Sequence, residues 1–235
     1  MEQVDILAIG AHPDDVEIGM GGTIAKHVEL GYKVGLLDLT RGEMGTNGSI
    51  EIRSSEGKKA MEILGCVFRL NLELPDGGVV CTKENVLKLV RVLRFTKPTL
   101  VFAPYWEDKH PDHVACSKLL DEAVFISSLK KFLPDVPPHK PKTACYYLIN
   151  PMVQPSFVVD VTEYYDTKVK AVLAHDSQFF TKGQSVSTEL NFNDGYPEKL
   201  NIRDRYFGLQ IHNTYGEGFI TKETVPVNDL FNMWR

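Results

Sequence analysis

The segment Val4-Asp-Ile-Leu-Ala-Ile-Gly10 leads directly into Ala11-His-Pro-Asp-Asp-Val-Glu17. The first segment is short and apolar, as expected for a strand buried inside a parallel sheet. The second segment places a histidine and three carboxylates directly after that strand. Open α/β sheets bind their ligands at the carboxyl ends of their strands. The two segments together therefore predict a buried strand that delivers polar side chains to a site.

Short apolar runs alternate with amphipathic stretches through the rest of the first half. We predict further strands at 33–39, 66–74 and 99–103, one helix that ends near residue 30, and helices at 53–64, 83–96 and 111–129. Successive βα units predict parallel strands joined by right-handed crossovers. The predicted fold class is α/β, a doubly wound, mostly parallel Rossmann-like sheet with helices on both faces.

The second half shows fewer clear elements. The proline-rich segment 130–142 is predicted to be a surface loop, because apolar strands resume at 144–149 and 156–161 and a helix follows at 163–175. The remainder, rich in Gly, Asn and Asp, is predicted to be mainly loop. We expect residues 1–235 to form a single domain.

Composition narrows the class of protein. The chain has 235 residues, a net charge of -5 and 43% apolar residues, which is typical of a soluble globular protein and gives no reason to expect a nucleic-acid partner. The four cysteines form no CxxC pair, which favours a reducing compartment over a disulfide framework. No signal peptide or long apolar run is apparent. We therefore expect a cytoplasmic protein without a membrane partner.

A second polar cluster, Pro104-Tyr-Trp-Glu-Asp-Lys-His110-Pro-Asp-His113, follows the predicted strand 99–103. It repeats the His-Pro-Asp sequence of residues 12–14. In a sheet of order 3-2-1-4, the first and fourth strands are neighbours at the point where the winding reverses. We therefore expect the two clusters to face one crevice.

Two imidazoles and one carboxylate suit Zn²⁺ and leave a coordination position open for water. A bound zinc lowers the pKa of that water toward about 7 and polarises a carbonyl, while a spare carboxylate accepts the proton. A histidine at a helix start is often only a cap, so each motif alone is weak. Their juxtaposition predicts a metal-dependent hydrolase.

Four segments carry a resemblance to a known family: Ala11–Glu17, His110-Pro-Asp-His-Val114, Thr40-Arg-Gly-Glu-Met-Gly45 and Arg53-Ser-Ser-Glu56. Through them the chain resembles the LmbE-like or PIG-L deacetylases, which use zinc to remove acetyl groups from N-acetylglucosamine moieties. The resemblance is strong in the first half of the chain and loose in the second.

The resemblance also implies roles for individual residues. It implies one zinc per chain, with another divalent metal as an alternative in the cell, bound by His12, Asp15 and His113. It implies that Asp14 is the general base and that His110, oriented by Asp112, stabilises or protonates a reacting group. Spacing alone does not separate the role of Asp14 from that of Asp15.

Within the family, the chain is similar to bacterial enzymes that deacetylate N-acetylglucosaminyl malate in bacillithiol biosynthesis, some of which accept simpler N-acetylglucosamine sugars. The implied partner is a small N-acetylated amino sugar, and the implied assembly is a homo-oligomer such as a hexamer. Related mycothiol-pathway deacetylases carry an active-site tyrosine where this chain has Asp108. The group that stabilises the oxyanion besides the metal is therefore open.

Three further residues are candidates for substrate binding. Arg53 begins a predicted helix, where the helix dipole disfavours a cation; by resemblance it binds the sugar, and a surface cation is the alternative. Arg41 and Glu43 either line the mouth of the crevice or pair with each other. Cys116 follows His113 on the same helical face, but a small core residue is the simpler interpretation.

Two other functions fit parts of the sequence. Gly19-Met-Gly21-Gly22 is similar to a dinucleotide-binding loop, but such a loop follows the first strand directly, whereas residues 12–18 intervene. Close helix packing is the alternative explanation for these glycines. A metal-dependent phosphoesterase needs cations around the phosphate, for which Lys109, Arg41 and Arg53 are the candidates.

Overall fold

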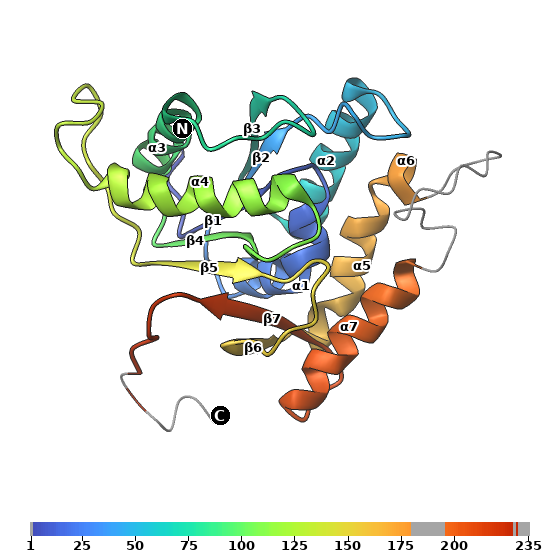
Figure 1. Ribbon diagram of the computed structural model, residues 1–235. Helices are drawn as coiled ribbons and strands as arrows, with labels where there is room; N and C mark the ends of the chain where they lie inside the picture. The colour runs from blue at the N-terminus through green and yellow to red at the C-terminus, as the bar shows by residue number, and fades with distance from the viewer. Residues whose placement is uncertain (1, 180–195, 228, 230–235) are drawn as a thin grey trace.

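The computed structural model describes residues 2–179, 196–227 and 229 (Figure 1). Within these residues, seven strands form one sheet of order β3-β2-β1-β4-β5-β7-β6. The strands are β1 (Ile6–Gly10), β2 (Val34–Thr40), β3 (Phe68–Leu74), β4 (Leu100–Pro104), β5 (Thr143–Tyr147), β6 (Phe157–Asp160) and β7 (Gly216–Thr221). The helices are α1 (Asp15–Glu29), α2 (Ile50–Leu64), α3 (Lys83–Thr96), α4 (Pro111–Ser127), the 3₁₀ turn η1 (Thr162–Tyr164), α5 (Tyr165–Leu173), α6 (Asp176–Phe179) and α7 (Tyr196–Gln210).

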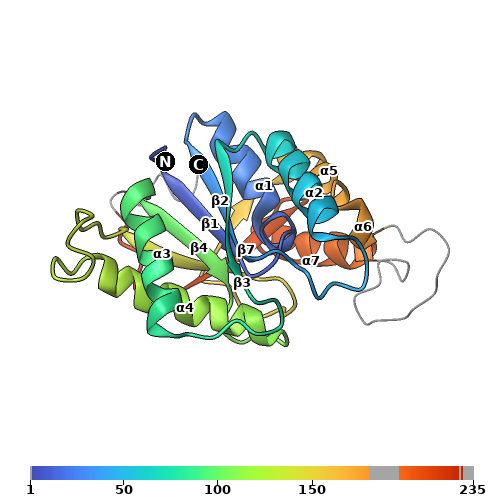
Figure 2. The ribbon, with the colours of Figure 1, turned by 90° about the horizontal axis from the view of Figure 1, so that it is seen from above.

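The central strands are parallel. β1 pairs with β2 and β4, and the β2–β3 and β4–β5 pairs are parallel as well. Helices α3 and α4 cover one face of the sheet, while α1, α2 and α5 cover the other (Figure 2). The strand order 3-2-1-4 and the doubly wound, mostly parallel α/β fold are therefore confirmed.

The expectation of mainly loop after residue 175 is wrong for the described part of that region. Helix α7 packs beside β7, and β7 enters the sheet antiparallel between β5 and β6. Both elements bury charged side chains, since Arg203, Asp204 and Glu217 are at most 5% exposed. Charged residues at inward positions conceal the apolar periodicity by which helices and strands are recognised in a sequence.

Capping residues fix the helices that border the site. Helix α2 begins at Ile50 rather than at residue 53, because the Ser49 hydroxyl accepts a hydrogen bond of 3.3 Å from the Ile52 N–H. Helix α4 begins at Pro111 as expected, and His110 is its N-cap, with Nδ1 accepting from the Asp112 N–H at 3.2 Å. A cap is thus one of the roles of His110.

The glycines of α1 allow close packing. A Cβ atom at Gly19 would lie 2.1 Å from the Tyr147 ring, and one at Gly22 would lie 2.7 Å from the Val161 side chain. Both glycines lie inside the helix and not at the turn that opens it. The packing explanation is therefore confirmed, and nothing in this geometry favours a dinucleotide loop.

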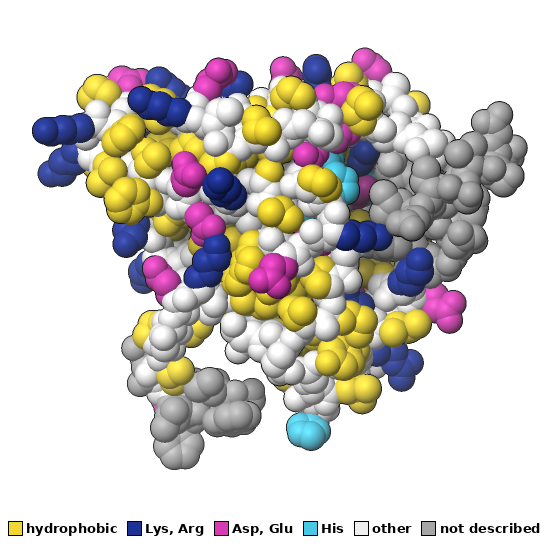
Figure 3. All heavy atoms as spheres, viewed as in Figure 1, with side chains coloured by type: hydrophobic (Ala, Val, Ile, Leu, Met, Phe, Trp, Pro, Cys, Tyr) yellow, Lys and Arg dark blue, Asp and Glu magenta, His cyan; other side chains and the backbone are white. Residues whose placement is uncertain are grey.

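The surface carries charges of both signs. Basic and acidic side chains are interspersed on the face shown in Figure 3, without a large patch of one sign. Among the helices that the structure describes, none combines the length and the apolar character required to cross a bilayer.

A buried ion network ties the C-terminal elements to α1. Lys168 is fully buried and its Nζ lies 2.7 Å from Asp204 and 2.6 Å from Glu217. Glu217 also accepts hydrogen bonds from the N–H groups of Gly22 and Thr23, at 3.0 and 2.6 Å. These N–H groups follow Met20, where the backbone leaves helical geometry. The network therefore stabilises the irregular part of α1.

We predict that Lys168→Met lowers the free energy of unfolding by about 3–5 kcal/mol, because it leaves the buried carboxylate of Glu217 without its cation and Asp204 with Arg203 alone. Chemical denaturation monitored by circular dichroism measures the change. Lys170→Met, on the exposed side of the same helix, is the matched control and should change stability by about 0.5 kcal/mol or less. Equal stabilities of the two variants would contradict the structural role of Lys168.

Candidate active site

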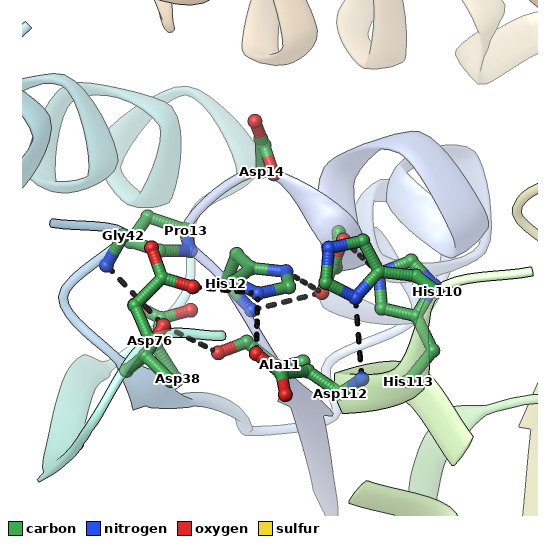
Figure 4. Close-up of polar contacts among 12 residues, drawn as sticks. Ala11, His12, Pro13, Asp14, Asp38, Gly42, Asp76, His110, Asp112 and His113 are labelled. Carbon is green, nitrogen blue, oxygen red and sulfur yellow. Dashed lines mark hydrogen bonds and ion pairs between the residues drawn. The ribbon is translucent and has the colours of Figure 1, made fainter. Parts of the chain in front are cut away.

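The two His-Pro-Asp segments meet at one edge of the sheet. β1 and β4 pair in register from Ile6 opposite Leu100 to Ala8 opposite Phe102, so the segments that follow them leave the same edge. His12 Nε2 lies 3.2 Å from Asp112 Oδ2, across 100 residues of sequence. Figure 4 shows the side chains of His12, Asp112 and His113 converging from the loop after β1 and the start of α4.

The three predicted metal ligands lie together and are buried. Asp15 lies between two imidazoles, with Oδ1 3.1 Å from His113 Nε2 and Oδ2 3.4 Å from His12 Nδ1. All three residues are at most 9% exposed. Two imidazoles and one carboxylate are a donor set that fits Zn²⁺. The residues present therefore fit the metal that the sequence predicts.

The charges in this cluster are strongly coupled. Burial opposes ionisation of Asp15, but His113 and His12 outweigh it and hold the pKa of the carboxyl well below its usual range. Burial disfavours the charged form of His113, yet Asp15 and Asp108 raise the pKa of this imidazole to about 9. Metal ligation needs neutral imidazoles. A cation that binds here would thus replace protons that Asp15 attracts.

Each histidine that is predicted to bind the metal has an acidic partner on the nitrogen that faces away from Asp15. Asp108 Oδ1 lies 3.2 Å from His113 Nδ1, and it also accepts hydrogen bonds from the His110 N–H and from Asn150. Asp112 contacts His12 and is itself held by the N–H groups of Gly77 and Val79, at 2.8 and 3.1 Å. Such outer partners fix the orientation of metal-binding imidazoles.

The placement of Asp112 differs from the expected one. Its carboxylate contacts His12 and not His110; only its backbone N–H contacts His110. His110 is partly exposed and its ring stacks on that of His113, with centroids 4.8 Å apart. Burial and the charges of His12 and His113 lower the pKa of His110. The cap of α4 and the ring stack therefore position His110.

Asp76 is a site residue that the sequence interpretation missed. It lies in the loop after β3, and its Oδ1 is 3.1 Å from His12 Nε2. His12, Asp76 and Asp112 form a second group of possible metal ligands beside the group of His12, His110 and His113. Asp76 follows a strand end, as the other site residues do. The rule that ligands bind at strand ends, applied to the third strand, would have found it.

Asp14 occupies a strained position. Its φ of 121° lies in a region that favours glycine. Its carboxylate is 3.3 Å from Arg53 Nη2, and Figure 4 shows it above the ring of His12 and pointing away from that ring. Burial raises the pKa of Asp14 to about 6, although Arg53 opposes this shift. A carboxylate with such a pKa suits a general base at neutral pH.

Arg53 is a buried residue of the site and not a surface cation. It is 5% exposed, and it donates from Nη2 to the Pro13 carbonyl at 2.5 Å and from Nη1 to the Gly42 carbonyl at 3.2 Å. Glycine is required at position 42, where a Cβ atom would lie 2.4 Å from Arg53 Nη1. Arg53 therefore joins the loop that carries Asp14 to the loop after β2.

The other two substrate-binding candidates, Arg41 and Glu43, both lie on the loop after β2, but their side chains have different surroundings. Glu43 Oε1 accepts a hydrogen bond of 3.0 Å from the Asp76 N–H, so Glu43 lies on the histidine side. Arg41 lines a cavity between α2 and β3. The structure shows no pairing between the two side chains. Cys116 lies fully buried in the apolar core, as the simpler interpretation has it.

A second buried network supports the start of α1. Glu17 is fully buried and contacts Arg69 Nη1 at 2.5 Å and His175 Nε2 at 3.3 Å. Arg69 also makes two contacts with Asp38, of 2.6 and 2.7 Å. Burial disfavours the charged form of Glu17, but Arg69 and His175 lower its pKa to about 2. The turn that carries Asp15 is therefore anchored to β2 and β3.

Comparisons with known proteins point to one family. The model of the PIG-L family, GlcNAc-PI de-N-acetylase, matches residues 7–124. The diacetylchitobiose deacetylase of Thermococcus kodakarensis is 34% identical over 189 residues, which cover 74% of this chain and 70% of that protein. The probable N-acetyl-α-D-glucosaminyl L-malate deacetylase 2 of Bacillus anthracis is 28% identical and covers 85% of this chain and 92% of its own.

A solved structure shows that the likeness extends over the whole fold. The conserved protein TT1542 of Thermus thermophilus superposes with a TM-score of 0.87 at 37% identity, and the match covers 97% of this chain and 99% of that one. The family match includes both His-Pro-Asp segments, which supply the buried cluster of imidazoles and carboxylates. The chain therefore belongs to the PIG-L family and is an N-deacetylase, with a donor set that fits the metal dependence of that family.

Proposed function

We propose that this enzyme is a zinc-dependent deacetylase of N-acetylglucosamine derivatives, with N-acetylglucosaminyl malate of bacillithiol biosynthesis as its substrate. The observation that carries the zinc assignment is the position of Asp15 between His12 and His113. The similarity to the Bacillus anthracis protein supports the malate conjugate. The similarity to the chitobiose deacetylase makes a disaccharide the first competing substrate.

His12, Asp15 and His113 would hold the metal. When bound, zinc would polarise the acetyl carbonyl and acidify a water molecule. Asp14 is the residue of this chain that accepts the proton from the attacking water, because its carboxylate is free of the imidazoles and its pKa is raised to about 6. Arg53 holds that carboxylate in place through its contact of 3.3 Å.

His110 would stabilise the developing charge, and the leaving amine would receive the proton that Asp14 takes from water or one from His110 in its protonated form. Its ring is fixed by the α4 cap and by stacking on His113. Asp112 would act by orienting His12, and Asp108 by orienting His113. With Asp108 in place of a tyrosine, His110 is the side chain of the described site with the best position to support the oxyanion.

Substrate binding involves the residues around this cluster. Arg53, Glu43 and Arg41 remain the proposed sugar-side contacts, and Asp76 joins them because it links Glu43 to His12. The resemblance extends the proposal to a cytoplasmic homo-oligomer, with a hexamer as the first state to examine by light scattering.

The function is tested by acetate release from a panel of substrates. N-acetylglucosaminyl malate, diacetylchitobiose and free N-acetylglucosamine are compared with phosphate esters at a measured zinc content. The proposal expects acetate release with the highest kcat/KM for the malate conjugate. A higher value for the disaccharide would move the assignment to chitobiose, and phosphate release without acetate release would contradict the deacetylase.

We predict that His113→Ala removes most of the bound zinc and of the acetate release, because it takes away one of two imidazole ligands. Elemental analysis of protein at known concentration measures the metal. His212→Asn, at an exposed position with a φ of 61° that Asn tolerates, is the control and should keep full zinc. Stoichiometric zinc in His113→Ala would show that the ligand set is wrong.

We predict that Asp14→Asn keeps zinc and fold while kcat falls by about 10²–10⁴-fold, the usual cost of losing a positioned base. Asp15→Asn is the matched variant and should lose zinc affinity first, since Asp15 contacts both imidazoles. Zinc content and kcat are measured on the same preparations. If Asp14→Asn retains wild-type kcat at saturating substrate, another residue must be the base.

A further inference from the structure

A cavity of about 560 Å³ lies between α2 and the edge strand β3, beside the metal cluster. Its volume is in the range of small-molecule sites, about 300–1,000 Å³. Pro13 and Arg53 form part of its wall, and neither histidine of the proposed metal site lines it. The cavity is therefore a neighbour of the metal cluster and lies outside it.

Four cations line this cavity: Arg41, Arg53, Lys58 and Arg69. Arg69 is neutralised within the protein, because it contacts both Asp38 and Glu17. Arg41 and Lys58 form no ion pair with the residues that the structure describes. Glu73 is the remaining acidic residue of the lining, and it is exposed to solvent, where its charge is screened.

Two guanidinium donors of the lining lack acceptors. Arg41 Nε and Arg53 Nε are both buried without a hydrogen-bond partner among the described residues. Arg53 is 5% exposed as a whole. Buried N–H donors are nearly always satisfied in native proteins. Both side chains line the cavity, so their guanidinium groups are placed to meet an acceptor that enters it.

We propose that this cavity is a binding site for a small anion, a carboxylate or phosphate group, held by Arg41 and Arg53 with Lys58 at its rim. Guanidinium groups recognise both anions through charge-assisted hydrogen bonds. Arg53 also donates to the Pro13 carbonyl and contacts Asp14. An anion in the cavity is thus connected to the loop of the proposed base through one side chain.

The anion has two possible sources. It is either free in solution, or it is a substituent of the acetylated sugar, in which case the inference rests on the proposed function. Binding of a free anion is measurable without turnover. The site can therefore be tested even if the deacetylase assignment fails.

Calorimetric titration of the zinc-loaded enzyme with inorganic phosphate and with succinate tests the first source. Arg41→Gln should weaken binding by about 10–100-fold, as expected for a lost charge-assisted hydrogen bond, and Lys58→Gln should weaken it less. Lys59→Gln, an exposed neighbour on α2 outside the lining, is the control and should bind as the wild type does. A circular dichroism melt shows that each variant is folded.

The second source is tested by KM for acetylated sugars with and without a carboxylate on the aglycone. If the anion is part of the substrate, Arg41→Gln raises KM for the carboxylated sugar alone. Anion binding without acetate release would contradict the proposed function and leave the anion site intact. The anion site is refuted if Arg41→Gln and Lys58→Gln change neither the affinity for anions nor that KM. This conclusion also holds if anions bind to the protein at the metal, because the two variants would then leave the affinity unchanged.

Discussion

The parallel pairing of β1 with β4 is the constraint on which the site depends. Both strands run toward the same edge of the sheet, so the residues after Gly10 and Pro104 leave the core together. Their loops then diverge into α1 and α4, on opposite faces of the sheet. The crevice between the diverging helices is where His12, Asp15 and His113 meet. An antiparallel arrangement would place the two His-Pro-Asp segments at opposite ends of the sheet.

Burial at this crevice disfavours the charge of Asp15, and the surrounding residues compensate that charge. Asp15 is removed from water, and two imidazoles compensate its charge. The imidazoles are in turn held by Asp108 and Asp112, which have N–H donors of their own. Each of these charged groups therefore has a partner of opposite charge or an N–H donor that lies farther from Asp15. Asp14 stands apart from these groups, contacts Arg53 and keeps a raised pKa, so burial gives the neighbouring carboxylates different properties.

The sequence predicted the elements whose inward faces are apolar, and it missed those whose inward faces are charged. The first four strands and helices follow apolar patterns of the right period, so their order and the meeting of the two motifs were predictable. Helix α7 and strand β7 were missed, because Arg203, Asp204 and Glu217 occupy buried positions. Asp76 was missed because Pro75-Asp-Gly-Gly78 has the composition of an ordinary turn. The position of this turn after a strand marks it as a candidate, and the contact of Asp76 with His12 gives it a role.

The elements that were missed explain how the predicted half keeps its geometry. The family match ends at residue 124, yet residues beyond that point form hydrogen bonds with the backbone of α1. Arg203 donates to the Ile18 carbonyl at 2.6 Å, and Glu217 accepts from the N–H groups after Met20. These contacts satisfy backbone groups that the irregular geometry of α1 leaves without helical partners. Because Asp15 opens the same helix, its placement between the imidazoles depends on charged residues nearly 200 positions away in the chain. The first half thus supplies the reactive side chains, and the second half fixes the helix that carries one of them.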